Sequence, residues 1–142
     1  MRLDVKNQFS DEQDIFTAAS NDSTEKIDLK APRNIGVGGL LHVFVVVDDA
    51  LVGAGTVTVS LKTADNKALT TNAVEKVILT IPATAKKGTN LIHTISPGEV
   101  DKRWLGLEYN KVGAVTAGKV SAWVVDNLDN WKAYPDNVVI KP

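Results

Sequence analysis

The clearest structural signal lies in residues 104–126, which read WLGLEYNKVGAVTAGKVSAWVVD. Apolar side chains alternate at both ends of this stretch: Leu105, Leu107 and Tyr109, then Val120, Ala122 and Val124. Alternation with a period of two places such side chains on one face of a β-strand. The residues between them are rich in Gly and Ala and indicate a turn. The stretch therefore predicts a hairpin-like unit in an all-β protein, with Trp123 on the opposite face and in the core of a second sheet.

The same signature recurs along the chain as short apolar, β-branched runs broken by Gly, Asn, Asp and Pro. Residues 40–48, LLHVFVVVD, are apolar on both faces, which is typical of a central strand covered on both sides. Residues 56–62 alternate cleanly and predict one solvent-exposed face. Further strands are predicted at residues 26–30, 74–81, 91–95 and 137–141. About eight short antiparallel strands of this spacing fold as a sandwich, a jelly roll or a closed barrel.

The first 24 residues differ from the rest, because they are polar and poor in Gly and Pro. Ser10 and Gln13 could cap a short helix over residues 10–19, but the Ser-Asn-Asp-Ser run that follows favours extended chain. We therefore predict an extended N-terminal arm over residues 1–24 and a single β domain over residues 25–142.

Composition excludes several classes of protein. The chain has 142 residues, 44% of them hydrophobic, and a formal net charge of -1, which argues against a nucleic-acid binder. It has no Cys, so disulfides and thiolate sites are excluded. The start lacks the apolar core of a signal peptide, and no apolar run is long enough for a membrane helix. We expect synthesis in a cytoplasm, with neither a nucleic-acid nor a membrane partner.

Residues that could carry chemistry are sparse. His42 and His93 are the only histidines, and each sits inside a strand pattern. Serine nucleophile motifs are absent, and the Gly36–Gly39 run does not fit a phosphate-binding loop. Asp48-Asp49 and the Asp and Asn residues of 126–130 are ordinary turn chemistry. We predict no catalytic residue, no metal and no cofactor, and we do not expect an enzyme.

Aromatic residues near the C-terminus are the best candidates for binding. Trp131 and Tyr134 lie in a short polar segment before Pro135. Exposed Trp and Tyr mark surfaces that bind proteins or sugars, although these two could equally cap an open end of the sandwich. A carbohydrate-binding β-sandwich module is therefore an alternative function.

Several stretches, in this order, resemble one known family. They are Asp28-Leu29, Arg33–Gly38, Gly55–Leu61, Pro97-Gly98, Arg103–Tyr109 and Thr116–Ala122. The chain is similar over residues 1–126 to the capsid cement (decoration) proteins of Bordetella-type short-tailed bacteriophages. The tail, residues 127–142, resembles the family less. The resemblance implies a jelly-roll protein on the outer capsid surface of the virion, made in the cytoplasm of a bacterial host.

The resemblance also implies partners. A cement protein would bridge neighbouring copies of the major capsid protein and self-associate as a homodimer or homotrimer. We expect the N-terminal arm to order against a neighbouring subunit or the shell, so that deletion of residues 1–20 weakens capsid binding and leaves the fold intact. The candidate protein-contact residues are the apolar residues of the arm and the aromatic residues of the tail: Phe9, Ile15, Phe16, Trp131 and Tyr134.

Overall fold

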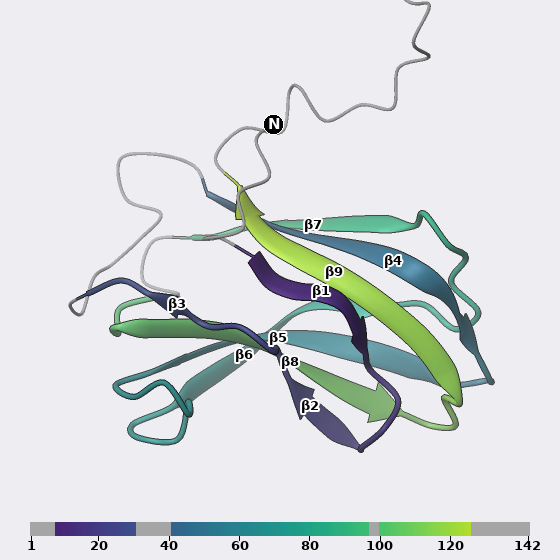
Figure 1. Ribbon diagram of the computed structural model, residues 1–142, viewed down its shortest axis with the longest axis horizontal. Helices are drawn as coiled ribbons and strands as arrows, with labels where there is room; N and C mark the ends of the chain where they lie inside the picture. The colour runs from purple at the N-terminus through teal and green to yellow at the C-terminus, as the bar shows by residue number, and fades with distance from the viewer. Residues whose placement is uncertain (1–7, 31–40, 97–99, 126–142) are drawn as a thin grey trace, which may run out of the picture.

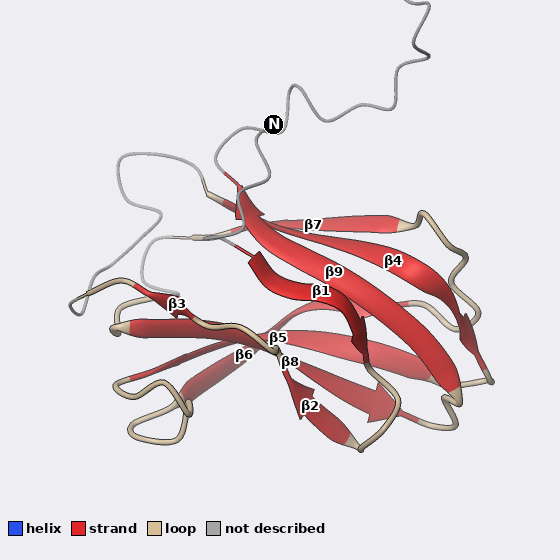
Figure 2. Ribbon diagram, viewed as in Figure 1, coloured by secondary structure: helices blue, strands red, loops and turns tan. Residues whose placement is uncertain are grey.

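The computed structural model describes residues 8–30, 41–96 and 100–125. Within them the chain forms nine strands and no helix, arranged as two packed antiparallel sheets (Figures 1 and 2). The upper sheet of Figure 1 has the order β1-β9-β4-β7, and the lower sheet has the order β2-β8-β5-β6 with β3 also beside β8. The strands are β1 (Gln8–Asp14), β2 (Ser20–Asp22), β3 (Ile27–Asp28), β4 (His42–Val52), β5 (Thr56–Ala64), β6 (Val74–Ile81), β7 (Asn90–Thr94), β8 (Trp104–Val112) and β9 (Ala117–Val125).

The strands pair from the ends of the chain inward. β1 pairs with β9, β2 and β3 with β8, β4 with β7, and β5 with β6. A chain paired in this way and rolled into two sheets is a jelly roll. The predicted all-β jelly-roll sandwich is therefore confirmed, with β2 and β3 sharing one position. The strand predicted at residues 137–141 lies outside the described residues.

The core fills the space between the sheets, because each strand turns alternate side chains inward. β4 contributes Val43, Val45 and Val47, and β5 contributes Val57, Val59 and Leu61. The polar atom of the inward-facing Tyr109 is satisfied, since its hydroxyl lies 2.8 Å from Ser10 Oγ. Burial raises the pKa of Tyr109, so this hydroxyl stays neutral in the core.

Residues 104–126 contain both predicted strands, but these do not pair with each other. β8 lies in the lower sheet between β2 and β5, whereas β9 lies in the upper sheet between β1 and β4. The connection that crosses between the sheets packs against the turn between β4 and β5, where Gly55 N donates to Ala114 O at 2.9 Å. Gly53 is required there: its φ is +113°, and a Cβ would lie 2.2 Å from Ala114 O.

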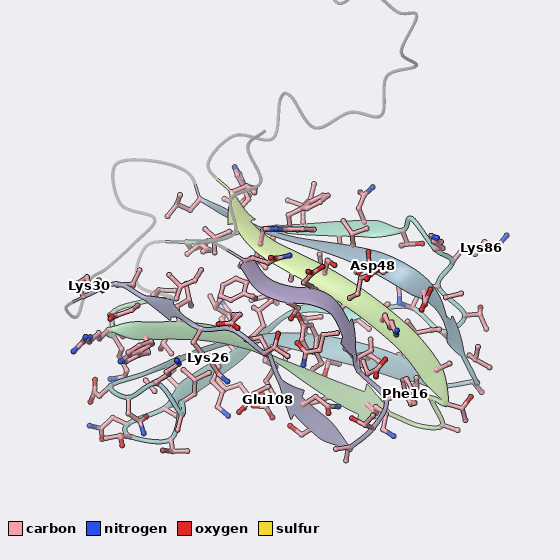
Figure 3. All side chains as sticks on the ribbon, viewed as in Figure 1. Phe16, Lys26, Lys30, Asp48, Lys86 and Glu108 are labelled. Carbon is pink, nitrogen blue, oxygen red and sulfur yellow. The ribbon has the colours of Figure 1, made fainter. Side chains whose placement is uncertain are left out.

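The N-terminal arm predicted over residues 1–24 differs from the structure from Gln8 onward. β1 is an edge strand of the upper sheet, and β2 is part of the lower sheet. Residues 15–19 cross between the two sheets, and Phe16 lies at this crossing (Figure 3). The prediction of a free arm was wrong because β1 is polar and irregular. It has two register shifts against β9 and a φ of +47° at Glu12. The helix considered for residues 10–19 does not form.

Candidate protein-contact surface

The five predicted contact residues do not form one surface. Phe9 and Ile15 are fully buried in the core, so they stabilise the domain and offer no surface to a partner. Phe16 is half-buried and packs against the core. Trp131 and Tyr134 lie outside the described residues. Phe9 and Ile15 were assigned to contacts because residues 1–24 were predicted to be a free arm, and pairing of β1 with β9 turns them inward.

An apolar row crosses the outer face of the upper sheet. Phe44 of β4 lies directly opposite Trp123 of β9 on one side and Ile92 of β7 on the other. The Phe44 and Trp123 rings lie 6.2 Å apart at an interplanar angle of 31°, a tilted aromatic pair. Phe44 is fully buried, Trp123 is half-buried and Ile92 is 42% exposed. We call these three residues the outer apolar row.

The position of Trp123 corrects one prediction. Its neighbours Ala122 and Val124 belong to the core, and Trp123 points the opposite way, as the alternation predicted. The face it occupies is the outer face of the upper sheet, however, and not the core of a second sheet. The sequence did carry a signal for this row, because residues 40–48 are apolar on both faces while only one face of β4 meets the core.

Polar side chains border the outer apolar row. On one side His42 Nδ1 lies 2.8 Å from Thr94 Oγ1. On the other side Ser121 Oγ donates to Asp48 and also accepts a hydrogen bond from the backbone N–H of Glu12 at 3.0 Å. His42 and Ser121 are themselves buried, so the polar groups beside the apolar strip are satisfied within the chain, and Trp123 and Ile92 are the members of the strip that reach solvent.

The outer face of the lower sheet carries a charged network (Figure 3 labels Glu108). Lys62 Nζ lies 3.0 Å from Glu108 Oε2 and 3.4 Å from Asp22 Oδ1, and the Ser20 hydroxyl donates to Glu108. Burial alone would raise the pKa of Glu108, but the hydrogen bond from Ser20 and the ion pair with Lys62 lower it. Burial acts to lower the pKa of Lys62, and its two carboxylate partners raise it. These charges are therefore matched within the chain.

The loop between β5 and β6 covers part of the lower face. The side chain of Leu69, from the loop after β5, is buried above Gly106 of β8. A Cβ at Gly106 would lie 2.5 Å from Leu69 Cδ1, so a glycine at this position leaves room for the Leu69 side chain. Asn66 holds the loop, because its side-chain oxygen accepts the N–H groups of Thr70 and Thr71 at 2.9 Å.

A further ion pair stands at one end of the lower face. Arg103 donates to both carboxylate oxygens of Asp28, at 2.8 Å and 2.9 Å. The guanidinium also lies 5.5 Å from the ring centroid of Trp104. The hydrogen bonds from Arg103 hold the pKa of Asp28 well below its usual range. Two stretches that carried the family resemblance, at residues 28–29 and 103–109, are thus in direct contact.

The described residues contain no group of three or more His, Cys, Asp or Glu placed to hold a metal ion. No helix in the described part of the chain could span a membrane. The described residues therefore form a β-sandwich whose lower outer face has its charges paired within the chain and whose upper outer face carries an apolar row. Such an arrangement can bind another macromolecule by surface complementarity.

A comparison with protein families shows which family the chain belongs to. The model of the Bbp16 family, a Bordetella phage protein family, matches residues 9–124. The chain belongs to this family, and it is a phage-encoded β-sandwich protein. No curated protein matches it. The match begins inside β1 and ends inside β9, so it covers the jelly roll from its first strand to its last.

Proposed function

We propose that the protein is a capsid cement protein that binds the outside of a phage head and bridges neighbouring copies of the major capsid protein. Its place in a phage protein family and its resemblance to capsid cement proteins support the proposal. The observation that carries it is the outer apolar row of Phe44, Trp123 and Ile92, in which Trp123 and Ile92 reach solvent. A half-buried Trp beside a second aromatic ring is the kind of anchor that dominates protein interfaces.

The physical logic of cement suits a small sandwich. A protein that binds only the assembled lattice stabilises that lattice by mass action. Each contact can be weak, because a self-associated cement protein engages several capsid subunits at once. The proposed partners are therefore the major capsid protein and other copies of this chain, and the proposed location is the outer capsid surface.

The test uses undecorated mature heads and the full-length protein. Wild type should sediment with heads and not with polysaccharide; the reverse result would favour a carbohydrate-binding module. Trp123→Ala should weaken head binding at least tenfold. Trp104→Ala is the matched control, since it removes a half-buried Trp from the outer face of the lower sheet. Equal head binding by both variants and wild type would remove the upper face from the proposal.

Two deletions distinguish a role of the N-terminal residues in head binding from their role in the fold. Removal of residues 1–20 deletes β1 together with Phe9 and Ile15 of the core, so it should unfold the protein, contrary to the expectation drawn from the sequence. Removal of residues 1–7 leaves every described strand in place. If the N-terminal residues contact the shell, the shorter deletion should weaken head binding and leave the unfolding midpoint unchanged.

A further inference from the structure

Two apolar side chains of the upper sheet are buried although they do not belong to the core. Phe44 is fully buried and Val125 is 3% exposed, yet neither is part of the core between the sheets. Both lie on the outer face, because their neighbours in the sequence, Val43, Val45 and Val124, point into the core. The outer face of an antiparallel sheet normally keeps contact with water. The burial of Phe44 and Val125 therefore indicates that this part of the face is covered.

The lower sheet shows how such a cover is built. Leu69 is also buried outside the core, because the loop between β5 and β6 folds back and places its side chain over Gly106. Figure 1 shows two layers of strands, with no third layer of described chain over the upper sheet. Trp123 and Ile92 flank Phe44, but they lie beside it in the sheet and not above it. A cover for the upper face has to come from another part of the chain.

We propose that the tail, residues 127–142, folds back over the outer apolar row of its own chain and covers it until the shell takes its place. Only the replacement by the shell rests on the proposed function; the contact within the chain does not. Covering the row removes apolar surface of Trp123 and Ile92 from water, which stabilises the covered form. It also reduces the exposed apolar patch of the free protein, and such patches promote aggregation.

The position and composition of the tail suit this contact. It begins two residues after Val125, the last residue of β9 and one of the two buried outer residues. Neighbouring strands are about 4.8 Å apart, so Ile92, two strands away on β7, lies about 10 Å from β9. The stretch from Asp126 to Trp131 spans about 20 Å when extended, so Trp131 can reach every member of the row. Trp131 and Tyr134 supply rings that can pack on the aromatic pair of the row.

Residues 1–7 are the natural comparison. They also begin beside the row, because Gln8 lies opposite Trp123. They read MRLDVKN and contain no aromatic residue. We therefore expect removal of residues 1–7 to leave the row covered and removal of the tail to uncover it.

The test measures how fast a thiol on the row reacts in the free protein, without heads. The chain has no Cys, so Ile92→Cys carries the only thiol, and its alkylation by iodoacetamide reports the exposure of the row. Removal of residues 127–142 should raise the alkylation rate about threefold or more, because the thiol then no longer waits for the tail to open. The double variant Trp131→Ala/Tyr134→Ala should do the same, and removal of residues 1–7 should leave the rate unchanged.

A control thiol on the lower sheet separates the cover from a general change in reactivity. Val112 is 55% exposed at the end of β8, and Val112→Cys should react equally fast with and without the tail. Circular dichroism checks folding, and Thr94→Cys, on the same face of β7, replaces Ile92→Cys if that variant unfolds. Equal rates for Ile92→Cys with and without the tail would overturn the inference. A faster rate after removal of residues 1–7 alone would do so too, since those residues would then be the cover.

A mixing experiment tests whether the tail covers its own chain. Ile92→Cys protein without the tail is alkylated alone and with an excess of wild type, which has no thiol. The two rates should be equal. A slower rate in the mixture would mean that the tail of another copy covers the row, and it would overturn the inference.

Head binding is scored separately, so the contact and the proposed function can fail independently. Covered chains cannot offer the row to the shell, so removal of the tail should tighten head binding about threefold or more. Weaker or unchanged binding would overturn the competition between tail and shell, and weaker binding would make the tail itself a shell contact. A tail that covers the row in a protein that does not bind heads would remove the cement function and leave the contact.

Discussion

The outer faces of the two sheets solve the same problem in different ways. Each sheet packs one face against the core, and its other face points away from the core. The lower sheet matches its charges internally, with Lys62 between Glu108 and Asp22, and covers Gly106 with Leu69. The upper sheet instead carries the outer apolar row, in which only Phe44 is fully buried.

This difference shows which outer face has its side chains satisfied within the chain and which face would gain from contact with a partner. Charges that are paired within the chain gain little from a second macromolecule, since a partner would have to desolvate and replace them. Half-buried aromatic and aliphatic side chains gain from losing their remaining contact with water. The upper face is therefore the one that would gain more from contact with a partner.

The largest expected effect tests whether the outer apolar row has a buried centre. Phe44→Ala should reduce the free energy of unfolding by about 3 kcal/mol, because it removes a fully buried ring from between Trp123 and Ile92. Ile92→Ala is the control on the same row and should cost under about 1 kcal/mol, since its side chain is 42% exposed. Urea denaturation of both variants provides the measurement. Equal losses would mean that the row is uniformly exposed.

The next effect tests how tightly the lower face is covered. Leu69→Ala should cost about 2 kcal/mol, because the side chain is buried above β8. Gly106→Ala should cost about 1–2 kcal/mol, because its Cβ would lie 2.5 Å from Leu69 Cδ1.

The double variant sharpens this test. Once Leu69 is shortened, a Cβ at Gly106 no longer meets its methyl group, so the double variant should lose less than the sum of the two single losses. Additive losses would show that the loop does not press on β8.

Much of the fold could be predicted because its strands are locally encoded. The alternation in residues 56–62 and 104–109 and the apolar run at 40–48 are properties of neighbouring residues, and β5, β8 and β4 form there. The pairing of these strands depends on contacts between residues far apart in the chain, so the crossover between β8 and β9 looked like a hairpin.

The contact residues were harder to predict, for a physical reason. β1 reads QFSDEQD, which has no alternation, and it becomes a strand only because β9 offers it a pairing edge. Phe9 and Ile15 therefore looked like free apolar anchors. The outer apolar row is assembled from three strands that are neighbours only after folding. Its members could be noticed singly in the sequence, but their alignment could not.

A smaller effect concerns the charges of the lower face. Glu108→Gln should reduce the free energy of unfolding at pH 7 by about 1 kcal/mol, because Lys62 loses one of its two carboxylate partners. The pKa of Glu108 is lower in the folded protein than in the unfolded chain. Its contribution is therefore fully present above the unfolded value of about 4.3 and is lost as the pH falls through the folded pKa.

Urea denaturation of wild type and Glu108→Gln at pH 7 and pH 3 checks this sign. The two proteins should differ at pH 7, and the difference should be smaller at pH 3, below the ordinary glutamate range. A gap of the same size at both values would mean that the charge of Glu108 does not matter and that only its packing does.

The smallest expected effect belongs to the Asp28–Arg103 pair, which joins β3 to the start of β8. The hydrogen bonds from Arg103 lower the pKa of Asp28, so the pair stabilises the fold at neutral pH and less as the pH falls below the ordinary aspartate range. Because the pair is exposed, Asp28→Asn should cause only a slight loss, and high salt should remove it. Arg103→Gln should behave alike, and the double variant should lose no more than either single change. A loss that persists in high salt would show that β3 depends on this pair for more than charge, and that the lower face is less complete within the chain than its comparison with the upper face implies.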